Sequence, residues 1–208
     1  MRKSLRQLAG LLIILPISLF SYGGEENMKV PTPIQNAFLL DGYALTNSVS
    51  GMMDGESVTT YRYQKSGPVD YFGEHISFVF TPSKKLKGLT RMTKDFEVSS
   101  QVLPTEKEAK DVATNFLATY AVDLEDDMDI RWIKPHDEDI YVNGKTHVIT
   151  GMKVKCRNLT DGTYFWVIVG KDQEVIVFER DIIWNFIQGG RQTEKWLHDD
   201  WLVKNIRK

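Results

Sequence analysis

The chain has 208 residues, of which 42% are hydrophobic and 26% are charged, and its formal net charge is −2. This balance is typical of a globular protein and excludes a wholly disordered or membrane-embedded chain. Residues 1–23 contain three basic and no acidic residues, so the remainder, with 23 basic and 28 acidic residues, has a net charge of −5. A mildly acidic body lacks the basic face that phosphate binding requires, which argues against nucleic acid as a partner.

Residues 1–23 have the pattern of a signal peptide. Three cations precede an uncharged apolar run of 13 residues, Leu8 to Phe20, and Ser21-Tyr22-Gly23 follows as a small-residue exit. The run is shorter than the ~20 residues of a membrane-spanning helix. We therefore predict cleavage after Gly23 and an exported protein, periplasmic or extracellular. The alternative is a retained signal anchor, in which case this segment is the chain's contact with the membrane.

The single cysteine, Cys156, has no intramolecular partner, so no disulfide stabilises the exported fold. It alternates with Met152 and Val154, which places all three on one face of a strand. This pattern predicts a buried, unreactive thiol rather than a nucleophile.

The mature chain is rich in predicted strands, and turn dipeptides separate several of them. We expect a flexible lead-in over 24–33, a β-rich subdomain over 34–102 and an α+β subdomain over 103–208. The expected strands are 38–40, 43–45, 58–64, 75–80, 86–92, 141–142, 145–149, 152–157, 163–169 and 174–182. The last of these has apolar residues on both faces, which predicts a central strand.

Two helices are expected. Thr105 and Glu108 form a capping box, and apolar residues then recur at helical spacing, which predicts an amphipathic helix over 105–121. A second helix is expected at 193–204. The segment 75–91 also aligns without gaps on 164–180, which indicates either a hairpin that is built twice or two unrelated hairpins of the same length and pattern. The predicted fold class is α+β, with two related antiparallel sub-sheets packed on the first helix and a C-terminal helix.

Two stretches resemble known families. The string Leu103 to Ala109 followed by Asp161 to Ile176 resembles a PepSY domain, although Gly170 and Gln173 replace that family's Asp and Gly. The stretch Val58 to Gly73 resembles the propeptide motif of fungalysin and thermolysin proteases. The resemblance implies a propeptide-like module of the cell envelope that binds a secreted or envelope protein, with a protease as the suspected partner.

No catalytic or metal-binding motif occurs. The histidines, His75, His136, His147 and His198, lack the spacing of a zinc site, and the acids at 125–129 and 137–139 lack the pattern of a calcium loop. We therefore predict a binding module that is not an enzyme and has no cofactor, no metal and no catalytic residue. A hydrolase with a scattered site is a rival hypothesis, and it requires titratable groups that converge in a cleft.

Aromatic residues supply the candidate binding surfaces. Trp184, Phe186, Trp196 and Trp201 cluster near the C-terminus, either as core residues under the terminal helix or as a partner-binding patch. The alternative function is a small-ligand carrier, with a pocket between sheet and helix that Phe116, Tyr120, Trp166 and Phe178 would line.

Overall fold

The computed structural model describes residues 29–65, 67–98, 102–185, 187 and 189–205, so the predicted signal peptide lies outside the described residues. The helices are α1 (Thr32–Phe38), α2 (Glu106–Tyr120) and α3 (Asp199–Asn205). The strands are β1 (Ala44–Met53), β2 (Glu56–Gln64), β3 (His75–Phe80), β4 (Leu86–Met92), β5 (Met128–Val142), β6 (Lys145–Asn158), β7 (Tyr164–Val169), β8 (Val175–Ile182), β9 (Trp184–Asn185) and β10 (Gly190–Arg191).

The α+β class is confirmed, and the two expected sub-sheets are halves of one antiparallel sheet. Its eight strands have the order β1-β2-β3-β4-β8-β7-β6-β5. Each half consists of a helix and a four-stranded meander, and the halves join where β4 pairs with β8. The aligned hairpins, β3-β4 and β7-β8, are therefore the four central strands. The boundary expected at 102/103 falls between the two halves.

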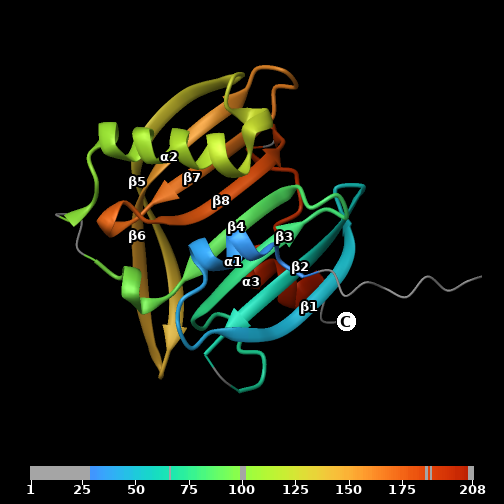
Figure 1. The fold of residues 1–208 in the computed structure, drawn as a ribbon, viewed down its shortest axis with the longest axis vertical. Coiled ribbons are helices and arrows are strands. Elements are labelled where there is room, and N and C mark those ends of the chain that lie inside the picture. Colours follow the sequence, from blue (N-terminus) through green and yellow to red (C-terminus); the bar gives the residue numbers. More distant parts are fainter. Residues whose placement is uncertain (1–28, 66, 99–101, 186, 188, 206–208) are drawn as a thin grey trace, which may run out of the picture.

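Helices cover both faces of the sheet (Figure 1). α1 and α2 lie on one face, where Phe38 and Phe116 belong to a core cluster that draws strand residues from both halves. α3 lies on the other face, which we call the α3 face. β8 is central and buried, as its sequence predicts, and Phe178 points to α2 while Val177 points to the α3 face.

Helix α2 follows directly from its sequence. The Thr105 hydroxyl accepts the Glu108 N–H, and the Glu108 carboxylate accepts the Thr105 N–H, which satisfies two amides at the start of the helix. Ala109, Phe116 and Leu117 form its buried face. The prediction of 105–121 is confirmed to within a residue at each end.

Strands β5 and β6 form a long ribbon that curls over the α3 face. Its far end reaches the first half, where the Tyr141 N–H donates to the Phe72 carbonyl over 2.7 Å and Glu97 forms a bridge with Ile149. A second apolar cluster, which includes Ile149 and Trp166, fills the space beneath the ribbon. The ribbon thus adds a wall to the α3 face.

Four local predictions are wrong. Residues 38–40 end helix α1 rather than form a strand, because Pro31 and Pro33 start a helix whose buried face is Ile34 and Phe38. The lead-in is not wholly flexible, since Val30 is buried in the core.

The terminal helix is the third wrong prediction. It begins at Asp199 rather than Thr193, because Thr193 and Glu194 turn back to accept hydrogen bonds from Arg191. The predicted strands 145–149 and 152–157 are one strand, β6, which continues through Gly151.

We expect Gly151→Ala to destabilise the protein. A methyl group at Gly151 would lie 2.6 Å from Ile168 Cγ2 and 3.0 Å from the Val169 carbonyl oxygen. Overpacking of this kind lowers the free energy of unfolding by about 1–3 kcal/mol, which urea denaturation measures. Gly190→Ala is the control, because nothing lies within 4 Å of its added methyl group. Equal unfolding midpoints for the two variants would contradict the prediction.

Candidate functional site

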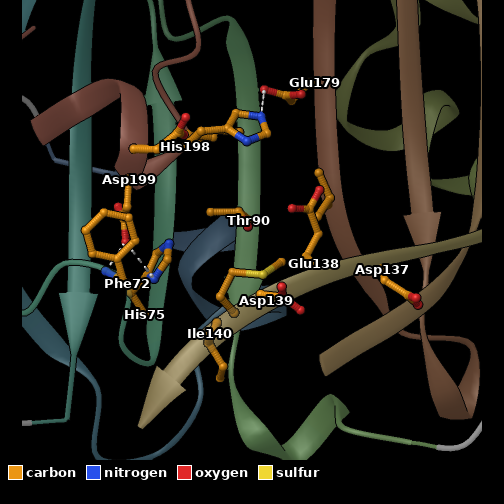
Figure 2. A pocket seen from close by; sticks show the side chains of 14 residues that line it. Phe72, His75, Thr90, Asp137, Glu138, Asp139, Ile140, Glu179, His198 and Asp199 are labelled. Carbon is orange, nitrogen blue, oxygen red and sulfur yellow. Dashed lines mark hydrogen bonds and ion pairs between the residues drawn. The ribbon is translucent and has the colours of Figure 1, made fainter. Parts of the chain in front are cut away.

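A cavity of about 390 Å³ opens on the α3 face, between the curled ribbon and α3. Figure 2 shows that its walls come from segments far apart in the sequence. Two imidazoles, His75 and His198, face it together with six carboxylates, which are Asp137, Glu138, Asp139, Glu179, Asp199 and Asp200. Titratable groups from β3, β5, β8 and the C-terminal segment therefore converge in one hollow.

Asp199 anchors α3 to the sheet. Its carboxylate accepts two hydrogen bonds from Arg62 on β2, at 2.7 and 2.9 Å, and one from the Phe72 N–H at 2.6 Å. The side chains of Asp199 and Arg62 are 6% and 4% exposed, so this ion pair is buried. Burial raises the pKa of Asp199, but the Arg62 charge, the Phe72 N–H and His75, when it is protonated, outweigh burial and lower the pKa.

His75 lies at the cavity wall beside Asp199 (Figure 2). Its Nδ1 lies 2.9 Å from the Gly73 carbonyl, so Nδ1 carries the hydrogen and donates it. Burial and the Arg62 charge lower the pKa of His75 to about 4, so the ring is neutral at pH 7. Its 3.9 Å approach to Asp199 is then not an ion pair. The buried Nε2 is then an acceptor, and no donor for it lies in the described part of the chain.

Glu179 is the second buried carboxylate. It accepts hydrogen bonds from Arg191 at 3.0 Å and from His198 Nε2 at 3.2 Å, and its side chain is 5% exposed. Burial raises the pKa of Glu179, but the charges of His198 and Arg191 outweigh burial and lower the pKa to about 2. Burial lowers the pKa of His198, but Glu179 raises it by more, so the net pKa is raised and favours the imidazolium.

The remaining carboxylates form an acidic rim. Asp137, Asp139 and Asp200 are exposed, and within the described ranges no ion pair neutralises them. Glu138 contacts His136 at 3.1 Å. Lys153 is a further cation near Glu179 and Glu138, and its ammonium lies 3.8 Å from the centroid of the Trp166 ring. Burial lowers the pKa of Lys153 to about 8, although the nearby charges of Glu179 and Glu138 raise it.

The charges around the cavity do not cancel. Six carboxylates line it. Four cations stand beside them: Arg62, Arg191, Lys153 and protonated His198. Within the described part of the chain these groups have a net charge of two negatives, and the carboxylates without an ion-pair partner, Asp137, Asp139 and Asp200, lie on the exposed rim.

The structure buries part of the predicted aromatic patch. Trp196 is 4% exposed and packs against Trp201, and both lie over Val58 and Val79 beneath the C-terminal segment. Trp184 is 36% exposed, and its ring faces Lys155. Phe186 lies outside the described residues. Trp196 is therefore a core residue and Trp201 packs partly buried against it, whereas Trp184 is exposed enough to belong to a partner-binding patch.

The expected carrier pocket is wrong in position. Phe116, Tyr120 and Phe178 pack together on the α2 face, with ring centroids 5.0 Å apart for Phe116 and Phe178. Trp166 points to the opposite face and belongs to another cluster. The sequence does not predict the cavity on the α3 face, because its lining residues come from segments that are far apart in the chain.

Two signals in the sequence could have pointed to the cavity. Asp137-Glu138-Asp139 and His198-Asp199-Asp200 are runs of consecutive titratable residues, and both runs line it. Arg62 in the otherwise uncharged centre of β2 also indicates a buried partner. Cys156 is buried as expected, and burial raises the pKa of its thiol to about 12.

No family model, curated protein or solved structure matches the chain. The resemblance to PepSY and propeptide domains therefore stays a prediction. Among the described residues, no group of three or more His, Cys, Asp or Glu side chains has an arrangement that could hold a metal ion. No helix in the same part of the chain is long and apolar enough to cross a membrane.

We expect Asp199→Asn to destabilise the fold strongly, because it leaves the buried Arg62 guanidinium without a counter-charge. The expected loss is about 3–5 kcal/mol of unfolding free energy in urea. Asp200→Asn is the matched control, since Asp200 is exposed and its loss should change the unfolding free energy by less than about 0.5 kcal/mol. Similar losses for both variants would show that the Arg62 pair does not anchor α3.

We expect His75 to make the protein less stable in acid. The pKa of its ring is about 4 in the folded chain and 6.5 ordinarily, so between these pH values the unfolded chain binds a proton that the folded chain does not. Stability should fall by up to about 3 kcal/mol as the pH drops from 6.5 to 4.

The neutral variant His75→Gln tests this. Urea denaturation at pH 7 and pH 4.5 should show a smaller acid loss in the variant than in the parent chain, because glutamine binds no proton in this range. Parallel losses would mean that His75 is not held neutral by its surroundings.

Proposed function

We propose that the protein is an exported, non-enzymatic binding protein that holds a ligand with protonated nitrogen groups in the cavity on the α3 face. The observation that carries the proposal is the set of acceptors around a hollow of about 390 Å³, with a surplus of negative charge at its rim. Pockets of roughly 300–1,000 Å³ suit small ligands. Export is supported by the sequence pattern of residues 1–23.

The chemistry of the lining favours a cationic ligand. Exposed carboxylates attract cations and accept hydrogen bonds from them, and hydrogen bonds between charged groups are stronger than those between neutral groups. The Nε2 of His75 is itself buried, so the acceptors that a ligand in the cavity meets are the exposed carboxylates. An anionic ligand would face repulsion from Asp139 and Asp200.

The convergence of acids and imidazoles is also what the hydrolase hypothesis requires, but the state of each imidazole favours binding over catalysis. His75 is neutral but buried, and its Nδ1 donates to a carbonyl. His198 is held in the charged form by Glu179, so it is a poor general base near neutral pH. These two contacts, to the Gly73 carbonyl and to the Glu179 carboxylate, activate neither a hydroxyl nor a thiol.

Isothermal titration with spermidine and cadaverine tests the proposal, and the uncharged 1,5-pentanediol serves as the matched ligand. The amines should bind and the diol should not. Binding should weaken as salt is added, because the rim charges are exposed and screened. If neither amine binds, or if the diol binds equally well, the proposal is wrong.

We expect the double variant Asp139→Asn, Asp200→Asn to bind the amines about tenfold or more weakly, since a hydrogen bond to a charged group contributes about 1.5–3 kcal/mol. Both residues are exposed, so the fold should be retained. Asp126→Asn removes an exposed acid from the turn before β5 and should leave the affinity unchanged. An equal loss in this control would point to net charge rather than to the cavity.

A tri-lysine peptide tests whether the cationic group that binds in the cavity is a side chain of a protein partner rather than a free amine. The protein partner suspected from the propeptide resemblance would place a lysine or arginine side chain in the cavity. Titration of the peptide beside the free amines distinguishes the two sources, because a partner-dependent site should favour the peptide.

A further inference from the structure

The two edges of the sheet differ sharply in chemistry. The β5 edge carries Pro135 and seven charged or histidine residues, Asp129, Arg131, Lys134, His136, Asp137, Glu138 and Asp139, which are devices that prevent a further strand from pairing. The β1 edge, Ala44–Met53, has no charged residue and no proline. Among the described residues β1 pairs only with β2, so its outer side is an open edge.

The register of β1 shows which backbone groups point outward. Met53 and Glu56 flank the two-residue turn Asp54-Gly55, whose φ angles are both positive. Residues that flank such a turn exchange hydrogen bonds, and the pattern then alternates along the hairpin. The N–H and C=O groups of Ser48, Ser50 and Met52 therefore point away from β2 and are available to another strand.

Four exposed side chains of β1 lie on one face of the sheet, with a shift of register between the first and the second. Leu45 is paired with Tyr63 and Ser48 with Tyr61, which places both on the face that α1 and α2 cover, together with Ser50 and Met52. Leu45 and Met52 are 50% and 54% exposed, and Ser48 and Ser50 between them are exposed as well. The order is apolar, polar, polar, apolar.

We propose that this edge pairs with the β1 strand of a second copy of the chain. In an antiparallel pair about a two-fold axis, Ser48 lies opposite Ser50 of the other copy, and Thr46 lies opposite the other copy's Met52. The register of β1 shifts between Leu45 and Asn47, and this irregularity places Leu45, next to Thr46, on the same face as Met52. The contact is self-complementary, as an isologous interface must be, and it opposes no like charges. Two sheets of eight strands join into one of sixteen.

Size-exclusion chromatography with light scattering tests the pairing on the chain purified from cells that express all 208 residues. The molar mass should approach twice that of one chain as concentration rises. Ser48→Pro should shift the protein to the monomer, because proline removes an outward N–H and breaks no bond to β2. Ser48→Lys should do the same by placing two like charges across the axis.

Tyr141→Lys is the control, since it adds a lysine at an exposed position on the β5 edge and should leave the dimer intact. Circular dichroism should show that all three variants stay folded, and if Ser48→Pro does not, Ser48→Lys still decides. A parent chain that is monomeric at every concentration would overturn the proposal. So would a dimer that both Ser48 variants retain.

Discussion

The buried carboxylates of Asp199 and Glu179 are the constraint on which the α3 face depends. Arg62 holds Asp199 across 137 residues of sequence, and Arg191 and His198 hold Glu179. A buried charge without a partner costs free energy, so the two residues of each ion pair have to stay together. Each pair therefore holds the C-terminal segment, which carries Asp199 and Arg191, against a strand of the sheet. These ion pairs hold α3 and the segment around Arg191 against the sheet. Trp196, which lies between Arg191 and α3 in the chain, packs against Val58 and Val79 of the sheet. The cavity exists because these segments stop short of the curled ribbon.

The sequence predicts those parts of the fold whose residues are close together in the chain. Helix α2 has its cap and its apolar face within 16 residues, and the central hairpins carry their own turn signals. The prediction of a strand at residues 38–40 is wrong because Phe38 and Leu39 suit a strand as well as the end of a helix. The contact of Phe38 with Phe116 on α2 favours the helix. At 193–204 the helical spacing of apolar residues is real, but Arg191 captures the carbonyls of Thr193 and Glu194 before a helix can begin.

The site could not be predicted in the same way, because its residues meet only after the sheet has formed. Asp137 to Ile140 reach His75 and Asp199 because the β5-β6 ribbon curls back to the Phe72 loop, and nothing in the local sequence encodes that curl. The repeated hairpins indicate two similar halves, yet the halves differ where function is proposed. The second half contributes the long ribbon, whereas the first half ends in the uncharged edge β1. The cavity and the open β1 edge therefore come from the features in which the two halves differ, and not from the hairpins that they share.

The separation of charges within the cavity has a consequence for how stability and binding are related. Asp199 and Glu179 are neutralised by arginines inside the protein, so they stabilise the fold and contribute little field to the entrance. Asp137, Asp139 and Asp200 stand in solvent, where they contribute little to stability but set the potential that an arriving cation meets. The charged arginines keep the pKa of Asp199 and of Glu179 below the ordinary values, so both buried pairs resist protonation. The entrance and the fold can therefore be changed separately, because a substitution on the rim alters the potential that a ligand meets and leaves the C-terminal segment anchored to the sheet.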